Sequence, residues 1–217
     1  MSLQRIAVIC CGMFAMMILM LLQQKKYPSV QKWKMVILSV LLTITGVLGT
    51  MIMYFIETGR FGGTSFFGAV LLVPILMLPA VLLKVPYKTI LDLCAPAECL
   101  MLAIMKIDCL INKCCEGRYL PSLKIVFPSQ IVESIMGLVV MAALISIGNK
   151  NKKTHLYAHY LIIYGASRFA LNWFRFGLKP FLLGLPNGNF WGLVSVMIGL
   201  VWLALAKHKK AAPSPKA

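Results

Sequence analysis

The chain has 217 residues, of which 60% are hydrophobic and 13% charged, and its mean hydropathy is +0.85. Soluble domains are roughly half apolar and a quarter charged, so this composition excludes an ordinary soluble protein and predicts an integral membrane protein. Lys and Arg number 22 against 6 Asp and Glu, a net charge of +16. In a membrane protein such an excess is typical of cytoplasmic loops, so it does not indicate a nucleic-acid partner.

Apolar runs long enough to cross a membrane follow one another along the chain. A spanning helix needs about 20 mostly apolar residues. Six runs meet this requirement, at residues 6–22, 36–55, 66–83, 130–147, 156–174 and 190–206. Residues 90–111 form a seventh run, which we predict to be a half-buried or irregular span. Its apolar character is interrupted by Asp92, Pro96, Glu98, Lys106 and Asp108.

The basic residues favour seven spans with the N-terminus outside and the C-terminus in the cytoplasm. This topology places 13 Lys and Arg on the cytoplasmic side and 7 outside, whereas omitting residues 90–111 gives at best 12 to 9. The first run has the length of a signal peptide, but its flanking Lys25 and Lys26 follow it, so we expect it to remain a span. We therefore predict an all-α, seven-helix transmembrane domain over residues 1–206 and a disordered basic tail over 207–217.

We single out four ionisable side chains, which lie within the spans or at their edge. Such groups are costly in a membrane, so they face the bundle interior, a cavity or a partner. They are Lys106, Glu133, Arg168 and Arg175. Arg168 and Arg175 are seven residues apart, which predicts that one face of the sixth helix presents both, together with Tyr164 and Asn172.

Two interpretations of this polar face are open. In the structural one, Arg168 pairs with Glu133 between two helices and Arg175 extends to the headgroups. In the functional interpretation, one carboxylate does not require as many polar partners as the two Arg, Tyr164 and Asn172 supply. Because guanidinium groups match phosphate oxygens, the pattern favours a site for a phospholipid headgroup or another anionic lipid.

The sequence predicts neither a metal nor a cofactor. Its seven cysteines include the adjacent pairs Cys10–Cys11 and Cys114–Cys115, but no CxxC or His–Cys ligand spacing is present. Cys109, Cys114 and Cys115 are expected on the outer side, where oxidation is open to them but not indicated. No Walker loop, GxSxG or HExxH motif occurs.

Five short motifs in chain order resemble the prolipoprotein diacylglyceryl transferase family, seven-span enzymes of the bacterial inner membrane. The resemblance runs from about residue 46 to about residue 200. Its motifs are GGTSFFG at 62–68, LDLCAP at 91–96, CCEGR at 114–118, PSQIVE at 128–133 and YGASRF at 164–169, the last followed by Phe174 and Arg175.

The resemblance implies transfer of diacylglyceryl from phosphatidylglycerol, or another anionic phospholipid, to the lipobox cysteine of a prelipoprotein or to another thiol acceptor. It implies catalytic roles for Arg168, Tyr164 and Glu133, with Arg168 cradling the departing phosphate. It also implies a lipid-binding set, which comprises Lys106, Arg175, Asn112, Gly117, Arg118, Ser65 and Gln130.

The chain departs from the family's motifs at several charged or polar positions. Lys106 stands where the family has Arg, and Phe67 stands where it has a loop His. Asn172 replaces a Glu, and Asn189 replaces a Gln of the last span. Because Phe cannot accept a proton, a mechanism that uses the loop His as a base is closed to this chain.

Three functions therefore remain open from the sequence. The first is diacylglyceryl transfer, or a related transfer from a phospholipid to a thiol or hydroxyl acceptor. The second is a catalytically impaired relative that binds anionic lipid or a lipidated peptide. The third, ranked lowest, is a small transporter or channel whose charged helix face lines a path, which Pro74 and Pro79 in the third span would suit.

Overall fold

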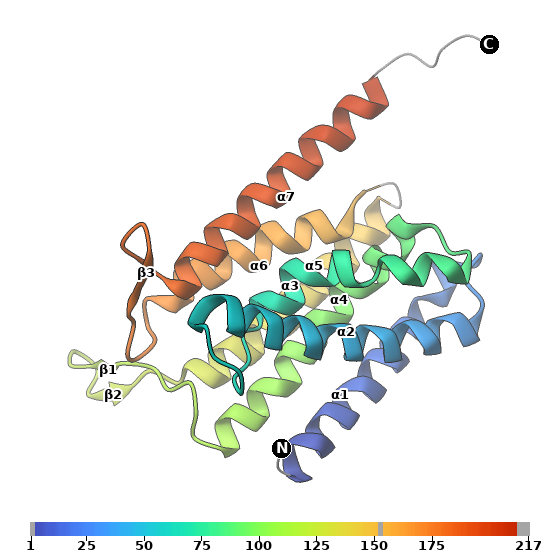
Figure 1. Ribbon diagram of the computed structural model, residues 1–217. Helices are drawn as coiled ribbons and strands as arrows, with labels where there is room; N and C mark the ends of the chain where they lie inside the picture. The colour runs from blue at the N-terminus through green and yellow to red at the C-terminus, as the bar shows by residue number, and fades with distance from the viewer. Residues whose placement is uncertain (1–2, 152–153, 212–217) are drawn as a thin grey trace.

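The computed structural model describes residues 3–151 and 154–211, which form a helical bundle with two short hairpins (Figure 1). Since no strand in this part of the chain exceeds three residues, the predicted all-α class is confirmed. The elements are α1 (Leu3–Leu22), η1 (Gln23–Lys25), α2 (Lys32–Thr58), α3 (Phe67–Leu76), η2 (Leu78–Leu83), α4 (Tyr87–Ile111), β1 (Tyr119–Leu120), β2 (Ile125–Val126), α5 (Ser129–Lys150), α6 (Leu156–Asn172), β3 (Pro180–Leu182), β4 (Leu185–Pro186) and α7 (Asn187–Ala211).

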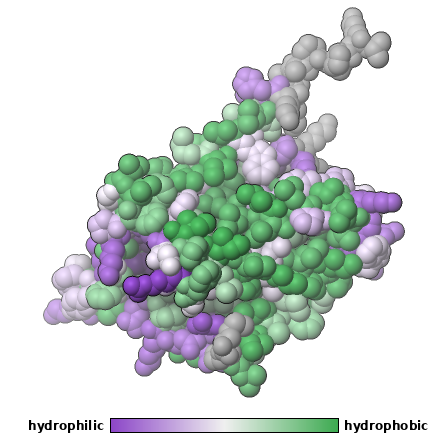
Figure 2. Space-filling model, in the orientation of Figure 1, coloured by the Kyte–Doolittle hydropathy of each residue, from purple (hydrophilic) through white to green (hydrophobic). Residues whose placement is uncertain are grey.

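The outer surface of the bundle is apolar. Within the described residues, four helical segments are long and apolar enough to cross a membrane, and they are Leu3–Lys25, Lys32–Thr58, Ser129–Lys150 and Asn187–His208. Exposed side chains on these segments include Phe14, Ile44, Val139 and Val201. Hydrophobic side chains cover most of the visible face in Figure 2, with hydrophilic ones gathered toward its ends. A surface of this kind fits a protein embedded in lipid.

The polar helix α4 is the centre of the bundle. It contacts α1, α5 and α6, and more than half of its residues are buried. Of the two predicted forms of this span, the half-buried one is confirmed, whereas the irregular one is wrong, because α4 is one continuous helix of 25 residues. Its carboxylates find partners on neighbouring segments. Asp92 accepts a hydrogen bond from the Leu156 N–H, and Glu98 accepts one from the Tyr157 hydroxyl. Asp108 forms an ion pair with Arg5. Other helices hide these polar groups from lipid, which hydropathy cannot register.

The third predicted span, residues 66–83, is divided into α3 and η2. Pro79 stands at the start of η2, where its missing N–H suits a new helix start. Pro74, inside α3, leaves the carbonyl of Val70 without its usual helical donor. The one hydrogen of the Tyr157 hydroxyl on α6 is shared between that carbonyl, at 2.9 Å, and Glu98 Oε1, at 3.1 Å, so α6 helps to satisfy the broken turn of α3.

Helices α2 and α3 meet at backbone contact, which fixes the start of α3. A Cβ on Gly68 would clash with the carbonyl group of Gly49 in α2. Glycine at both positions allows this close approach. The contact places Phe67, the first residue of α3, against the interior, where it is 4% exposed.

Both hairpins lie at one end of the bundle, here called the hairpin end (Figure 1). The chain leaving α4 and the chain leaving α6 are joined there. Arg118 N donates to the Phe174 carbonyl at 2.8 Å, and Phe176 N donates to the Glu116 carbonyl at 3.1 Å. These bonds bring residues far apart in sequence to the same end of the molecule.

The predicted boundary between the membrane domain and its tail falls inside a helix. We expected disorder from Lys207, but α7 continues to Ala211, and this part of the prediction is wrong. Lys and Ala are good helix formers, and they extend an apolar helix that is already nucleated. The rest of the predicted tail, residues 212–217, lies outside the described residues, as do residues 152–153 of the predicted cytoplasmic charge.

Candidate functional site

One buried carboxylate holds three cations at the hairpin end. Glu133, in the first turns of α5, lies 2.5 Å through Oε2 from Lys106 Nζ and 3.4 Å through Oε1 from Arg175 Nε. Its Oε1 also pairs with Nη1 of Arg168. The Glu133 side chain is only 3% exposed. We call these four residues the cation cluster.

The cation cluster has more positive charge than its carboxylate can balance. Three cations against one anion leave a net charge of +2, with the Lys106 and Arg168 side chains each 10% exposed. Buried charge is costly unless it is paired. Two unbalanced cations therefore favour an anionic ligand, and guanidinium groups suit phosphate oxygens.

The sequence prediction for this cluster is confirmed in one part and wrong in another. The predicted pair between Arg168 on α6 and Glu133 on α5 is present. Arg175, however, does not lie on the face of α6, because that helix ends at Asn172. It reaches Glu133 from the following turn, where its backbone bridges to Gly117. The segment at Gly117, rather than helical periodicity, therefore positions Arg175.

Aromatic rings form the wall of the site on the side of α3. Tyr164 is 1% exposed, and its ring centroid lies 5.6 Å from that of Phe66 and 5.8 Å from that of Phe67. Phe67 is the residue that replaces the loop His of the resemblance. The replacement therefore lies against Tyr164, one turn of α6 before Arg168, and leaves this wall without a proton acceptor at position 67.

The two other substituted polar positions meet each other. Asn172 Nδ2 donates to Asn189 Oδ1 at 2.6 Å, and Asn189 Nδ2 donates to the Phe169 carbonyl at 2.8 Å. Both side chains are buried. Asn172 therefore joins α6 to α7, and Arg168 takes its carboxylate partner from Glu133.

Four predicted lipid-binding residues make their contacts outside the cation cluster. Ser65 Oγ donates to Glu57 Oε1 at 2.6 Å, and Asn112 Nδ2 donates to Asp108 at 2.9 Å. The Arg118 guanidinium lies over the Phe174 ring at 5.4 Å, and Gln130 Nε2 donates to the Cys114 carbonyl at 2.7 Å. Their roles in lipid binding stay predictions.

Gly117 has a backbone role that supports the cluster. Its Cα faces the carbonyl of Phe127 so closely that a Cβ would clash with it. The close approach lets the chain after α4 run between Phe127 and Arg175, the residue with which Gly117 forms its bridge. A side chain at position 117 would displace the turn that carries Arg175.

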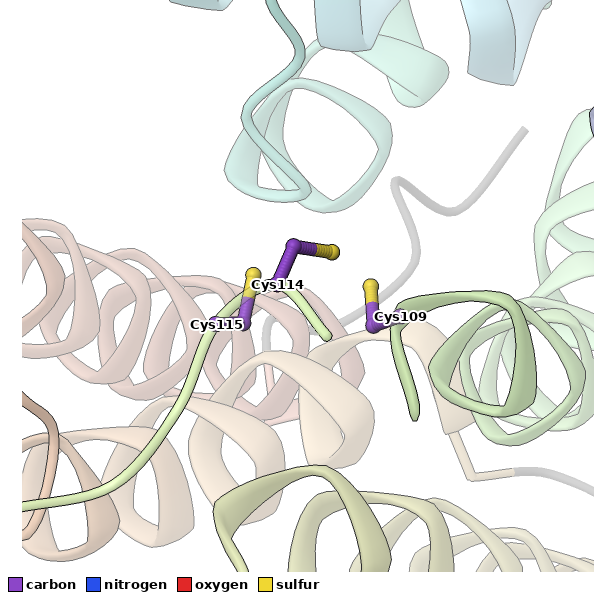
Figure 3. Close-up of side chains that lie close together, drawn as sticks. All are labelled: Cys109, Cys114 and Cys115. Atoms are coloured by element: carbon purple, nitrogen blue, oxygen red, sulfur yellow. The ribbon is translucent and has the colours of Figure 1, made fainter. Parts of the chain in front are cut away.

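Three thiols without an assigned role gather at the end of α4 and in the turn that follows it (Figure 3). The Sγ atoms of Cys109, Cys114 and Cys115 lie within 4.8 Å of one another. A hydrogen bond from the Cys109 thiol, helped by the positive charges of Lys106 and Arg175, lowers the pKa of Cys115 to about 5. The signal in the sequence was three cysteines within seven residues, which a search for CxxC spacing overlooks.

Comparison with known proteins identifies a family for this chain. Residues 6–205, nearly the whole described chain, match the family described as prolipoprotein diacylglyceryl transferase. Among curated proteins, none matches this chain. The family match covers every member of the cation cluster and all three clustered thiols. The chain belongs to the prolipoprotein diacylglyceryl transferase family.

Proposed function

We propose that this protein transfers diacylglyceryl from phosphatidylglycerol to the lipobox cysteine of a prelipoprotein. Its family implies prolipoprotein diacylglyceryl transfer in general. The observation that carries the proposal for this chain is the net +2 charge of the buried cation cluster. A phosphodiester with one negative charge suits such a site, and the glycerol phosphate that leaves carries more charge than the lipid did.

The proposed reaction is a displacement at carbon. The acceptor thiol loses its proton to water, and its sulfur attacks the glyceryl carbon that bears the phosphate. A carbon–sulfur bond forms as the carbon–oxygen bond breaks, and the bonding electrons leave with the phosphate oxygen. Arg168 and Arg175 stabilise this developing charge, Lys106 adds a third cation, and Glu133 holds all three in place.

Tyr164 has a positioning role in this proposal. It is buried one helical turn before Arg168 and is held between the rings of Phe67 and Tyr160. Its ring limits the orientations that the Arg168 guanidinium can take. Pre-orientation matters because a misplaced donor loses much of its transition-state stabilisation.

A transfer assay tests the proposal. Purified protein is incubated with phosphatidylglycerol in mixed micelles and a lipobox peptide, and both the peptide mass gain and the released glycerol phosphate are measured. Arg168→Ala is expected to lower turnover about 10²–10³-fold. Arg60→Ala, which removes an exposed cation, is the matched control and should retain turnover. Absence of product with the unmodified protein overturns the proposal, and equal turnover with phosphatidylcholine overturns the anionic donor.

We also propose the bacterial inner membrane as location, with seven spans, the N-terminus outside and the hairpin end facing outward. Support comes from the 13 to 7 distribution of basic residues and from the exposed apolar surface of the bundle. A membrane-impermeant thiol reagent added to spheroplasts that have been washed with a metal chelator should label the exposed Cys115. Labelling only after permeabilisation would reverse the orientation.

Phe67 favours a second candidate, a catalytically impaired relative that binds anionic lipid. Its ring occupies the position of a proton-accepting His and packs against Tyr164. Phosphatidylglycerol binding that depends on Arg168, without any peptide modification, would support this candidate over the transferase.

A further inference from the structure

The turn after α4 brings three sulfur atoms together. Cys109 lies in the last turn of α4, and Cys114 and Cys115 lie on the turn that follows. In Figure 3, the side chain of Cys114 extends toward that of Cys109. All three Sγ atoms are within 4.8 Å of one another. We call these residues the thiol cluster.

Hydrogen bonds from backbone and side-chain groups hold the backbone of the thiol cluster. Cys114 N donates to the Cys109 carbonyl at 3.0 Å. From the start of α5, Ser129 Oγ donates to the Cys115 carbonyl at 2.5 Å and Gln130 Nε2 donates to the Cys114 carbonyl at 2.7 Å. Cys115 itself has a left-handed φ of 59°, an uncommon conformation for a residue with a side chain. The thiols are thus held together and are not merely close in sequence.

Two positive charges lie near the thiol cluster. Lys106 lies within electrostatic range of Cys109 and Cys115, and Arg175 within range of Cys115. Three thiolates around one divalent cation have a net charge of −1. The adjacent cation cluster has a net charge of +2, so the two clusters are complementary when such a cation is bound.

We propose that Cys109, Cys114 and Cys115 bind one Zn²⁺ ion as thiolates. Zinc–sulfur bonds are about 2.3 Å long, so tetrahedral coordination needs sulfurs about 3.8 Å apart. The observed limit of 4.8 Å requires only small side-chain rotations to reach this spacing. Three protein ligands leave the fourth position open, and the exposed Cys115 places the site at the surface.

The open position would take the thiol of the acceptor, a step that rests on the proposed function. A thiol that coordinates zinc loses its proton, here to water. The resulting thiolate can attack the glyceryl carbon as the carbon–oxygen bond breaks, and the zinc ion undergoes no redox change. The thiol cluster would then supply the activation that Phe67 cannot, next to the cations that bind the phosphate.

Cobalt binding tests the site without any substrate. Metal-free, reduced protein is titrated with Co²⁺, and the thiolate-to-cobalt charge-transfer absorption is followed. We expect saturation at one equivalent and displacement of cobalt by Zn²⁺. Cys109→Ser, Cys114→Ser and Cys115→Ser should each lose most of the absorption, while Cys11→Ser, which changes an exposed cysteine on α1, should retain it.

A second measurement uses the unmodified protein, so it does not depend on the folding of variants. One equivalent of Zn²⁺ should protect the three clustered thiols from alkylation, as read by peptide mass spectrometry, and leave Cys10 and Cys11 unprotected. Absence of both stoichiometric cobalt absorption and zinc protection overturns the proposal, as does a disulfide within the cluster that persists in the protein as isolated from membranes.

The two proposals fail in distinguishable ways. Adding the lipobox peptide to the cobalt-loaded protein should shift the cobalt d–d bands if its thiol occupies the fourth position, and a peptide with Ser in place of Cys should not. Stoichiometric metal binding without transfer supports the zinc site and overturns the proposed function. Transfer by a protein that binds no metal does the reverse.

Discussion

Asn172 on α6 and Asn189 on α7 share a buried hydrogen bond of 2.6 Å between their side-chain amides. Both positions depart from the motifs that the chain otherwise resembles, and the two departures meet. The pair joins the helix that carries Arg168 to the last helix, and Asn189 continues to the Phe169 carbonyl. A neutral amide pair therefore fixes the end of α6, and the charged partner of Arg168 comes from α5.

This pair should show energetic coupling. Asn172→Ala or Asn189→Ala alone leaves a buried amide without its partner, which costs about 1–3 kcal/mol. The double variant removes both groups, so its loss in free energy of unfolding should fall short of the sum by about 0.5–3 kcal/mol. Denaturant unfolding in detergent, followed by tryptophan fluorescence, measures the cycle. Additive losses would show that the two amides act independently.

Glu133 should matter more for stability than any one of its cations. Glu133→Gln leaves three cations without a carboxylate, and breaking a buried ion pair costs about 3–5 kcal/mol. Arg168→Ala leaves two cations and one carboxylate, so the remaining charge is better balanced. We expect the midpoint of thermal unfolding to fall further for Glu133→Gln than for Arg168→Ala.

The matched control for this comparison of unfolding midpoints is Glu116→Gln, which removes an exposed carboxylate at the same end of the bundle. Surface changes of this kind are usually within about 0.5 kcal/mol. If Glu133→Gln proved as mild as the control, the charge balance inferred for the cation cluster would be wrong.

Glycerol phosphate, the product of the proposed reaction, should stabilise the protein by binding the cation cluster. A ligand that binds only the folded state raises stability by mass action, about 2.7 kcal/mol at 100 times its Kd. The rise in unfolding temperature should be much smaller in Arg168→Ala and unchanged in Arg60→Ala. Glycerol, which lacks the phosphate, provides the ligand control, and equal effects of the two compounds would contradict an anion site.

The sequence predicts the polar core of this site because charge within a membrane segment is rare and must be paired. Glu133 and Arg168 satisfy each other as expected. Hydropathy failed for α4 because Asp92, Glu98 and Asp108 find partners on segments distant in sequence. Such partners depend on tertiary packing, which one segment's composition does not encode.

The remaining parts of the site depend on irregular backbone. Arg175 reaches Glu133 from a turn whose backbone bridges to Gly117. Cys115, which itself has a left-handed φ, lies close to Cys109. Helical periodicity describes neither arrangement, because both lie beyond helix ends. The motifs include Gly117, Arg175 and Cys115, and the structure adds Cys109 and supplies the geometry.

Phe67→His tests whether the chain has changed its chemistry or lost it. The ring at position 67 is 4% exposed and packs against Tyr164, so an imidazole there must bury polar nitrogens in an aromatic wall. If the thiol cluster activates the acceptor, the unmodified protein turns over and Phe67→His lowers its rate. Turnover that appears only in Phe67→His would instead identify an impaired relative. Phe66→His, at the neighbouring ring, is the control for loss of packing.

Alkylation of Cys115 should show an unusual pH profile. Its pKa of about 5 lies below the ordinary thiol value, so the reactive thiolate is present above pH 5 and is lost as the pH falls through 5. In metal-free, reduced protein, the rate of Cys115 modification by iodoacetamide should reach its plateau well below pH 7.

Two variants test the cause of the lowered pKa. Cys109→Ala removes the hydrogen bond that contributes most to this shift, and Arg175→Ala removes a smaller electrostatic contribution. Both should therefore raise the midpoint of the profile, Cys109→Ala more than Arg175→Ala. Lys179→Ala, an exposed cation at the same end, should leave it unchanged. A midpoint near 8 in the unmodified protein would show that neither Cys109 nor the cation cluster stabilises this thiolate.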